Sequence, residues 1–146
     1  PAAFRAWDGG ARAVGGAARM APLHLADELR NGRLRVADLL ARASVLAAAN
    51  DLAPAAMVVE PGLATFRRAL LRLLARPVGI SGSGPTHWAF YPSHAEASAA
   101  AEVVRGAITA GSLSAPGPHE PFVTATRILS TIHAGSTTAD QHRREP

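Results

Sequence analysis

The sequence predicts an α+β fold in which helices pack on one face of a small, mostly antiparallel sheet. Apolar residues recur at helical spacing through the first half of the chain, whereas short segments of the second half alternate as strands do. A chain of 146 residues has the usual size of one domain, and 48% apolar residues suffice for one core. Three short strands would leave a sheet edge open, so we expect a strand from a further segment to complete the sheet.

Helical patterns occupy most of the first half. A short helical start at residues 2–8 leads into a Gly-, Ala- and Arg-rich stretch of low expected order, and residues 23–32 predict a helix that ends at an Asn-Gly pair. Residues 35–50 and 62–76 predict two longer amphipathic helices. Their apolar stripes are Val36, Leu39, Leu40, Ala43 and Leu46 in the first, and Leu63, Phe66, Leu70, Leu73 and Leu74 in the second. The arginines expected to face water on the second are Arg67, Arg68, Arg72 and Arg76.

Strand patterns dominate the second half. Residues 78–80 form a short apolar run, and residues 86–92 alternate so that successive side chains fall on opposite faces. A capping box that begins at Ser93 predicts a helix over residues 94–108. Residues 122–129 alternate again and predict a final strand.

The composition excludes several kinds of site. The chain contains neither cysteine nor lysine, which rules out disulfides, thiolate metal ligands, Schiff bases and a phosphate-binding lysine. Its basic residues are all arginines without the interleaved aromatics of a nucleic-acid surface, and its six histidines lack helical metal-binding spacing, so we expect neither nucleic acid nor metal ligands. No apolar run reaches the roughly 18 residues of a membrane span, and the start lacks a signal-peptide pattern, so we expect a cytoplasmic protein without membrane contact.

Two polar segments are candidates for a functional role. Asn50 and Asp51 stand at the end of a predicted helix before Pro54, where a single carboxylate after an asparagine is more typical of a cap than of an acid-base pair. The second segment is a glycine-serine loop between two predicted strands. It consists of Ser81, Gly82, Ser83 and Gly84.

The glycine-serine loop fits neither of two common phosphate-binding motifs. A Walker loop needs a lysine, and a dinucleotide fingerprint needs a third glycine that opens a helix, whereas Pro85 follows here. Glycines can turn successive N–H groups toward an anion, and the serines add hydroxyl donors. The same glycines also suit a tight connection that only requires positive φ. Composition leaves both interpretations open.

Three segments resemble the GHMP kinases. GISGSGPTHWAFYPSHAEASAA, residues 79–100, resembles the third conserved motif of that family, a Ser-Gly-Ser-Gly-Pro/Ala-Thr segment before a strand and an alanine-rich helix. AANDLAPAAMVVEPGLATFRRAL, residues 48–70, and PAAFRAWD, residues 1–8, are similar to segments of the branch that acts on 4-diphosphocytidyl-2-C-methyl-D-erythritol. The resemblance covers roughly residues 1–129 and implies the ferredoxin-like carboxy-terminal domain of the family.

The resemblance implies an activity and places residues in it. The implied activity is ATP-dependent phosphorylation, with Mg²⁺, of the 2-hydroxyl of this cytidylylated methylerythritol in non-mevalonate isoprenoid biosynthesis. It implies that the loop of residues 81–84 lies close to the phosphates, that Phe4 stacks on the cytosine and that Pro1 lies in the neighbouring pocket. His87 departs from the pattern, because relatives have a small or apolar residue there.

The amino-terminal domain of the family, with its glycine-rich ATP loop and catalytic lysine and aspartate, is not matched in this sequence. We therefore expect residues 1–129 to be the carboxy-terminal domain of a kinase cut just before Pro1, inactive without its amino-terminal domain and free of catalytic residues. Residues 130–146 are polar and aperiodic and predict a disordered tail. Two alternatives stay open, namely another GHMP kinase such as homoserine kinase and a non-catalytic α+β binding module.

Overall fold

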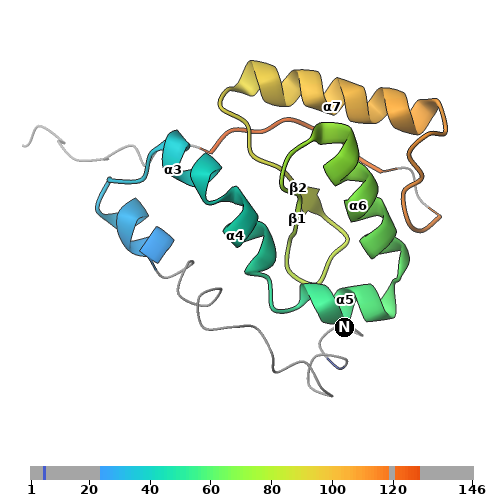
Figure 1. The fold of residues 1–146 in the computed structure, drawn as a ribbon, viewed down its shortest axis with the longest axis horizontal. Coiled ribbons are helices and arrows are strands. Elements are labelled where there is room, and N and C mark those ends of the chain that lie inside the picture. The colour runs from blue at the N-terminus through green and yellow to red at the C-terminus, as the bar shows by residue number, and fades with distance from the viewer. Residues whose placement is uncertain (1–4, 6–23, 119–120, 129–146) are drawn as a thin grey trace, which may run out of the picture.

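The computed structural model describes Arg5, residues 24–118 and residues 121–128 (Figure 1). This part of the chain is mostly helical, with one small antiparallel sheet. Apart from Arg5, which is helical, the helix predicted at residues 2–8 lies outside the described residues, and so does the tail predicted at residues 130–146. The central helices and strands of the prediction all fall within the described residues.

The first described helix, residues 24–30, forms and ends as predicted. The N–H of Asn31 donates to the carbonyl of Asp27 at 3.0 Å, and Gly32 adopts a left-handed conformation with a φ of 62°. Glycine takes this conformation without the steric penalty of a Cβ. The Asn-Gly pair therefore stops this helix.

The helix predicted over residues 35–50 is instead broken into α3 (Val36–Ala41) and α4 (Ala43–Ala48). Arg42 lies at the break, with φ −98° and ψ 3°. The guanidinium of Arg42 donates two hydrogen bonds, of 2.6 and 2.9 Å, to the carboxylate of Glu28, which lies in the helix of residues 24–30. This paired, charge-assisted contact links the break to the helix of residues 24–30.

The break also changes which residues of the predicted stripe are buried. Val36 is 54% exposed, so its placement in the core was wrong. It precedes the break, whereas most of the buried residues follow it. The buried residues of α3 and α4 are Leu39, Ala43 and Ala47.

A short helix that the pattern did not indicate, α5 (Ala53–Val59), comes next. Pro54 lies in its first turn, where the missing N–H costs nothing because the first N–H groups of a helix have no partner within it. Its buried residues, Ala55 and Ala56, carry too little apolar surface to stand out as a stripe. α5 packs against the following helix.

The long predicted helix is α6 (Gly62–Leu74). It ends at Ala75, which is left-handed with a φ of 49°. Leu73 was predicted to be buried but is 39% exposed, whereas Leu74, the next residue of the stripe, packs against the core. The buried residues of α6 are Leu63, Phe66 and Leu70.

One arginine of α6 does not simply face water. The Nε of Arg67 donates a 2.6 Å hydrogen bond to the carbonyl of Val78, and the side chain is half-buried. Its aliphatic stem can cover apolar surface while its head group donates, which the apolar pattern does not reveal. The prediction was wrong for Arg67, whereas Arg68 and Arg72 are exposed as expected.

The sheet of the described residues has two strands, β1 (Gly79–Ile80) and β2 (His87–Trp88), which pair antiparallel. Gly79 faces Trp88 across the ladder, and α4 packs against β1. A Cβ at Gly79 would lie 2.3 Å from atoms of the Trp88 indole, so only glycine fits. Of the strand predicted over residues 86–92, only the start pairs, because β2 consists of His87 and Trp88 alone.

The main core lies between α6 and α7 (His94–Thr109), which pack side by side (Figure 1). The N-cap half of the predicted capping box is confirmed, because the Ser93 hydroxyl accepts a 3.2 Å hydrogen bond from the Glu96 N–H; the Glu96 carboxylate accepts from the Ser93 hydroxyl rather than from its N–H. Val78, 1% exposed, extends this core toward the sheet. The buried core residues are Phe66, Leu70, Val78, Val104 and Leu113.

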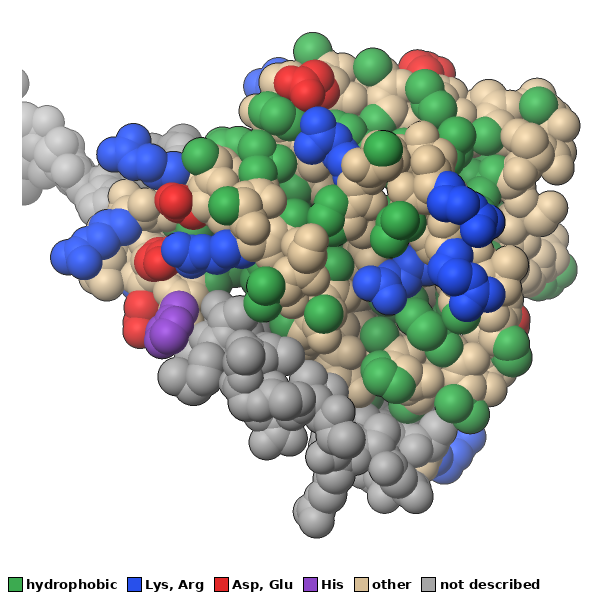
Figure 2. All heavy atoms as spheres, viewed as in Figure 1, with side chains coloured by type: hydrophobic (Ala, Val, Ile, Leu, Met, Phe, Trp, Pro, Cys, Tyr) green, Lys and Arg blue, Asp and Glu red, His purple; other side chains and the backbone are tan. Residues whose placement is uncertain are grey.

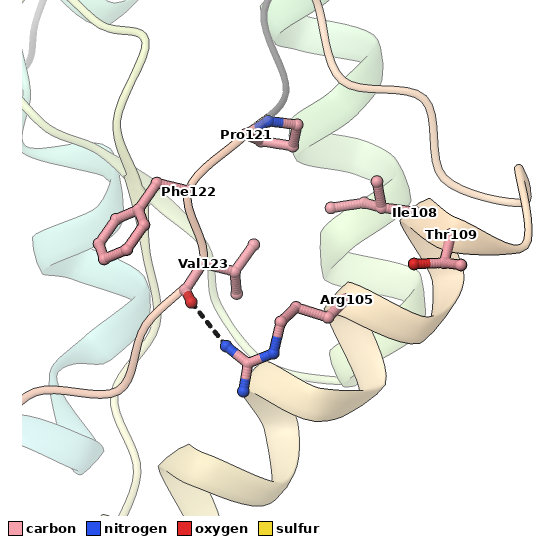
Figure 3. Close-up of a pocket in the computed structure, with 6 residues that line it drawn as sticks. All are labelled: Arg105, Ile108, Thr109, Pro121, Phe122 and Val123. Carbon is pink, nitrogen blue, oxygen red and sulfur yellow. Dashed lines mark hydrogen bonds between the residues drawn. The ribbon is translucent and has the colours of Figure 1, made fainter.

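The final predicted strand does not form within residues 121–128, which pair with no other strand of the described chain. Phe122 and Val123 nevertheless point to opposite sides of the backbone (Figure 3). Phe122 is 89% exposed, whereas Val123 packs against the core, and the Val123 carbonyl accepts a 2.6 Å hydrogen bond from Arg105 Nη1. The alternation predicted an extended chain correctly, but the ladder was wrong, so the larger sheet of a ferredoxin-like fold is not present in the described part.

Candidate functional site

The glycine-serine loop connects β1 and β2 and reaches toward α5 (Figure 1). Two of its four N–H groups are used internally. The Ser81 N–H donates to the Thr86 carbonyl at 2.9 Å, and the Gly84 N–H donates to the Ser81 carbonyl at 3.0 Å. The loop is thus a closed turn with a defined backbone path.

The other two N–H groups of the loop belong to Gly82 and Ser83. Among the described residues, no acceptor takes a hydrogen bond from the N–H of Gly82 or Ser83, and neither Ser81 nor Ser83 uses its hydroxyl. Ser81 and Gly82 are exposed, and Ser83 is half-buried. Two N–H groups and two hydroxyls are therefore close together at one bend, which is a donor set suited to an anion with several oxygens.

Both glycines of the loop are needed where they stand. Gly82 has a φ of 53° and Gly84 a φ of 76°, which place both in the left-handed region. A Cβ at Gly84 would also lie 3.2 Å from Leu63 Cδ1, whereas a Cβ at Gly82 would meet nothing within 4 Å. Gly84 therefore packs onto α6, and Gly82 forms the open tip of the bend.

Asn50, predicted as a cap or turn residue, contacts the loop directly. Its Nδ2 donates to the carbonyls of Ile80, at 2.8 Å, and Gly82, at 2.7 Å. Its Oδ1 accepts from the Leu52 N–H at 3.0 Å, which is the expected turn contact. The turn role was predicted from sequence, whereas the contact with the loop was missed because residues 30 and 32 positions apart gave no pattern.

A large apolar groove begins just after the loop. It has a volume of about 1290 Å³, and its walls come from α6, α7, β2 and residues 121–128. Pro85 and Thr86 line it, but the loop residues 81–84 do not. The predicted phosphate-proximal residues therefore lie beside the groove and not in it.

His87 and Tyr91 line the groove with buried polar atoms. His87 Nε2 and Tyr91 Oη have no hydrogen-bond partner among the described residues, while His87 Nδ1 lies 2.8 Å from the Pro85 carbonyl. Burial lowers the pKa of His87 and raises that of Tyr91, and the nearby Leu63 carbonyl opposes the shift of His87 in part. The His87 ring meets Phe66 edge-on, with centroids 5.2 Å apart, so the half-buried histidine packs against the edge of the core.

The surface over α6 mixes charge with apolar side chains (Figure 2). Leu71 is 46% exposed among the arginines of this helix. On α5, which neighbours the loop, Val58 is 75% exposed and Val59 47%. A second, smaller pocket of about 450 Å³ lies between the end of α7 and residues 121–123, next to Arg105 (Figure 3).

The other predicted site residues cannot be placed beside the loop. Pro1 and Phe4 lie outside the described residues. Asp51, next to Asn50, makes no side-chain hydrogen bond within the described part of the chain. The structure thus brings Asn50 to residues 81–84 and leaves the predicted base-stacking site without a described geometry.

The donor set of the loop fits phosphate oxygens better than it fits a metal ion. N–H groups and hydroxyls donate to phosphate, whereas Mg²⁺ is bound by carboxylate and carbonyl oxygens. Within residues 24–118 and 121–128, no group of three or more histidine, aspartate or glutamate side chains could hold a metal ion. None of the helices described there has the length and apolar character that a membrane crossing requires.

The comparison with protein families gives one match. Residues 25–108 match the family described as GHMP kinases C terminal, and this range contains Asn50, the glycine-serine loop and most of α7. No curated protein and no solved structure matches the chain. The match spans more than half of the 146 residues. The chain therefore belongs to the GHMP kinases, ATP-dependent small-molecule kinases, of which it carries the carboxy-terminal domain.

Proposed function

We propose that the loop of residues 81–84 helps to enclose the phosphates during phosphoryl transfer to the 2-hydroxyl of 4-diphosphocytidyl-2-C-methyl-D-erythritol. The observation that carries the proposal is a set of four donors, the N–H groups of Gly82 and Ser83 and the hydroxyls of Ser81 and Ser83, that have no hydrogen-bond partner among the described residues. Phosphoryl transfer depends mostly on positioning and on stabilising negative charge, so donors fixed in direction are the useful kind.

The choice of this acceptor rests on sequence resemblance. The segment around Asn50 and the start of the chain are similar to the branch of the family that acts on the cytidylylated acceptor. In this proposal Phe4 stacks on the cytosine and Pro1 lies beside it. Stacking of a base on an aromatic ring contributes roughly 1–3 kcal/mol, enough to select among acceptors.

The resident nucleotide would be ATP with Mg²⁺, and the metal, when bound, neutralises charge on the phosphates. The residues of this chain that would contact the nucleotide are Ser81, Gly82 and Ser83, through N–H and hydroxyl donors. An amino-terminal domain of the family type would supply the main ATP loop and the catalytic groups. The carboxy-terminal domain then contributes binding and orientation rather than a catalytic residue.

The test is a phosphoryl-transfer assay on the kinase that contains this domain, with homoserine as the competing acceptor. We expect transfer from ATP to the cytidylylated acceptor only. A double variant, Ser81→Ala with Ser83→Ala, should lower kcat roughly 10-fold or more, since it removes two donors from the charged transition state. Ser44→Ala, on the exposed side of α4, is the matched control and should leave kcat unchanged.

Three outcomes would contradict parts of the proposal. Transfer to homoserine instead of the cytidylylated acceptor would move the chain to another branch of the family. An unchanged kcat in the double serine variant would remove the serine hydroxyls from the proposed contact. Turnover by the purified 146-residue chain alone would show that it needs no separate ATP-binding domain.

A further inference from the structure

The side-chain amide of Asn50 makes three hydrogen bonds. Its Nδ2 donates to the carbonyls of Ile80 and Gly82, and its Oδ1 accepts from the Leu52 N–H. A residue that only made the turn before α5 would need no more than the contact through Oδ1. The two bonds from Nδ2, one to the end of β1 and one to the loop, therefore need a separate explanation.

The orientation of the Asn50 amide follows from its partners. The two carbonyls can only accept and the Leu52 N–H can only donate, so only the arrangement with Nδ2 toward the loop satisfies all three. Exchanging the two amide atoms would place an oxygen against two carbonyl oxygens. The contact is thus specific for asparagine at this position.

We propose that Asn50 is the positioning residue that fixes the direction of the Ser83 N–H and so holds the bend of the glycine-serine loop, an inference that rests on the phosphate-binding role proposed above. The carbonyl of Gly82 and the N–H of Ser83 belong to one planar peptide unit and point in opposite directions. Because Asn50 holds that carbonyl, the Ser83 N–H must point away from Asn50.

The neighbouring peptide units obey the same rule. The Ser81 carbonyl is held by the Gly84 N–H, so the Gly82 N–H points to the opposite side of that peptide. Asn50 also holds the carbonyl of Ile80, whose peptide partner, the Ser81 N–H, donates to Thr86. Asn50 therefore acts on two of the peptide units that define the bend.

Asn50 is suited to this role by where it stands in the chain. It follows α4, which packs against β1, and it precedes α5, whose Ala56 lies under Gly84. A side chain anchored between two packed helices loses little further freedom when it binds a loop. The glycines provide the conformations that the bend needs, and Asn50 selects one of them.

The experiment compares three variants of the full 146-residue chain by NMR. Asn50→Asp keeps the size and the Oδ1 acceptor but turns an oxygen toward the two carbonyls, and Asn50→Ala removes all three bonds. Asn31→Asp makes the same chemical change at a turn that contacts no part of the loop. Thermal unfolding and amide dispersion report whether each variant remains folded.

The first readout is the order of the loop backbone, which needs no ligand. In the unmodified chain the N–H vectors of Gly82 and Ser83 should have order parameters near 0.85, and both Asn50 variants should lower that of Ser83 below about 0.6. Asn31→Asp should leave them unchanged. Equal order parameters in the unmodified chain and in either folded Asn50 variant would overturn the inference.

The second readout is titration with inorganic pyrophosphate, followed at the same two N–H signals. The unmodified chain and Asn31→Asp should show saturable shifts, and the Asn50 variants should bind at least tenfold more weakly. If pyrophosphate moves neither signal in the unmodified chain, the phosphate-binding proposal fails while the order parameters still decide the role of Asn50. If it binds the Asn50 variants with unchanged affinity, the inference fails and the phosphate proposal stands.

Discussion

Two segments of this domain alternate in the manner of strands, and only one of them is in a sheet. Residues 86–92 and residues 121–128 both alternate, yet β2 (His87–Trp88) pairs with β1 while the later segment lies extended and unpaired within the described chain. β2 is held by its ladder hydrogen bonds to β1 and by the fit of Trp88 over Gly79. Residues 121–128 are held by the packing of Val123 against the core and by a hydrogen bond from Arg105 to the Val123 carbonyl.

The difference shows that an alternating pattern predicts which face each side chain occupies but does not predict whether the strand pairs with another. Alternation sets which side chains share a face, and both segments obey it. Pairing requires in addition a neighbouring edge at the right distance and a connection that fixes the register. The loop of residues 81–84 supplies that connection to β2.

The strongest test of the paired segment is Gly79→Ala. The new Cβ would lie 2.3 Å from the Trp88 indole, so the strands must separate or the indole must leave its place. We expect the free energy of unfolding to fall by about 3 kcal/mol, as for overpacking at a rigid contact. Urea denaturation followed by circular dichroism measures the loss.

Gly106→Ala is the matched control for that substitution. Gly106 lies in α7 with nothing within 4 Å of its hypothetical Cβ, so alanine should stabilise the helix by roughly 0.5–1 kcal/mol. A second comparison combines Gly79→Ala with Trp88→Ala, which removes the clash. If the two losses simply add in the double variant, the contact between Gly79 and Trp88 does not restrain the hairpin.

Helix ends show how far local signals reach in this chain. The Asn-Gly stop at Gly32 and the capping box at Ser93 act within a few residues, and both were predicted. The break at Arg42 was not, because it involves Glu28, fourteen positions away and on another helix. Only the folded chain brings these two residues together.

The candidate site divides in the same way. The free donors of the glycine-serine loop could be proposed from residue types and resemblance alone, since glycine conformations and serine hydroxyls are local properties. The contact from Asn50 could not, because it joins the end of α4 to a loop about thirty residues later. The sequence suggested a turn there and could not indicate a second partner for the same amide.

Acid should weaken the paired segment through His87. Burial, and secondarily the charge of Arg67, lower the pKa of His87 below its usual 6.5, although the Pro85 and Leu63 carbonyls oppose this. Between the two pKa values the unfolded chain binds more protons, so stability is full above about pH 6.5 and falls as the pH drops below it. Unfolding by urea at a series of pH values from 7.5 to about 5 measures this slope.

His87→Gln removes the ionisation and should flatten the slope, whatever it costs in packing against Phe66. His94→Gln, at the exposed start of α7, is the control and should keep the slope of the unmodified chain. A slope that survives His87→Gln would assign the acid sensitivity to another group and leave the buried histidine without a role in it.

The unpaired segment should respond to a smaller change, Arg105→Ala, and respond locally. Arg105 Nη1 donates to the Val123 carbonyl at 2.6 Å, while the same side chain also pairs with Glu102. Its loss should leave global unfolding nearly unchanged but free residues 121–128 to move, so trypsin should cut after Arg127 several-fold faster. Arg72→Ala, exposed on α6, is the control and should leave that rate unchanged. If Arg105→Ala does not change the rate either, the packing of the half-buried Val123 against the core is enough to keep the segment in place without the hydrogen bond from Arg105.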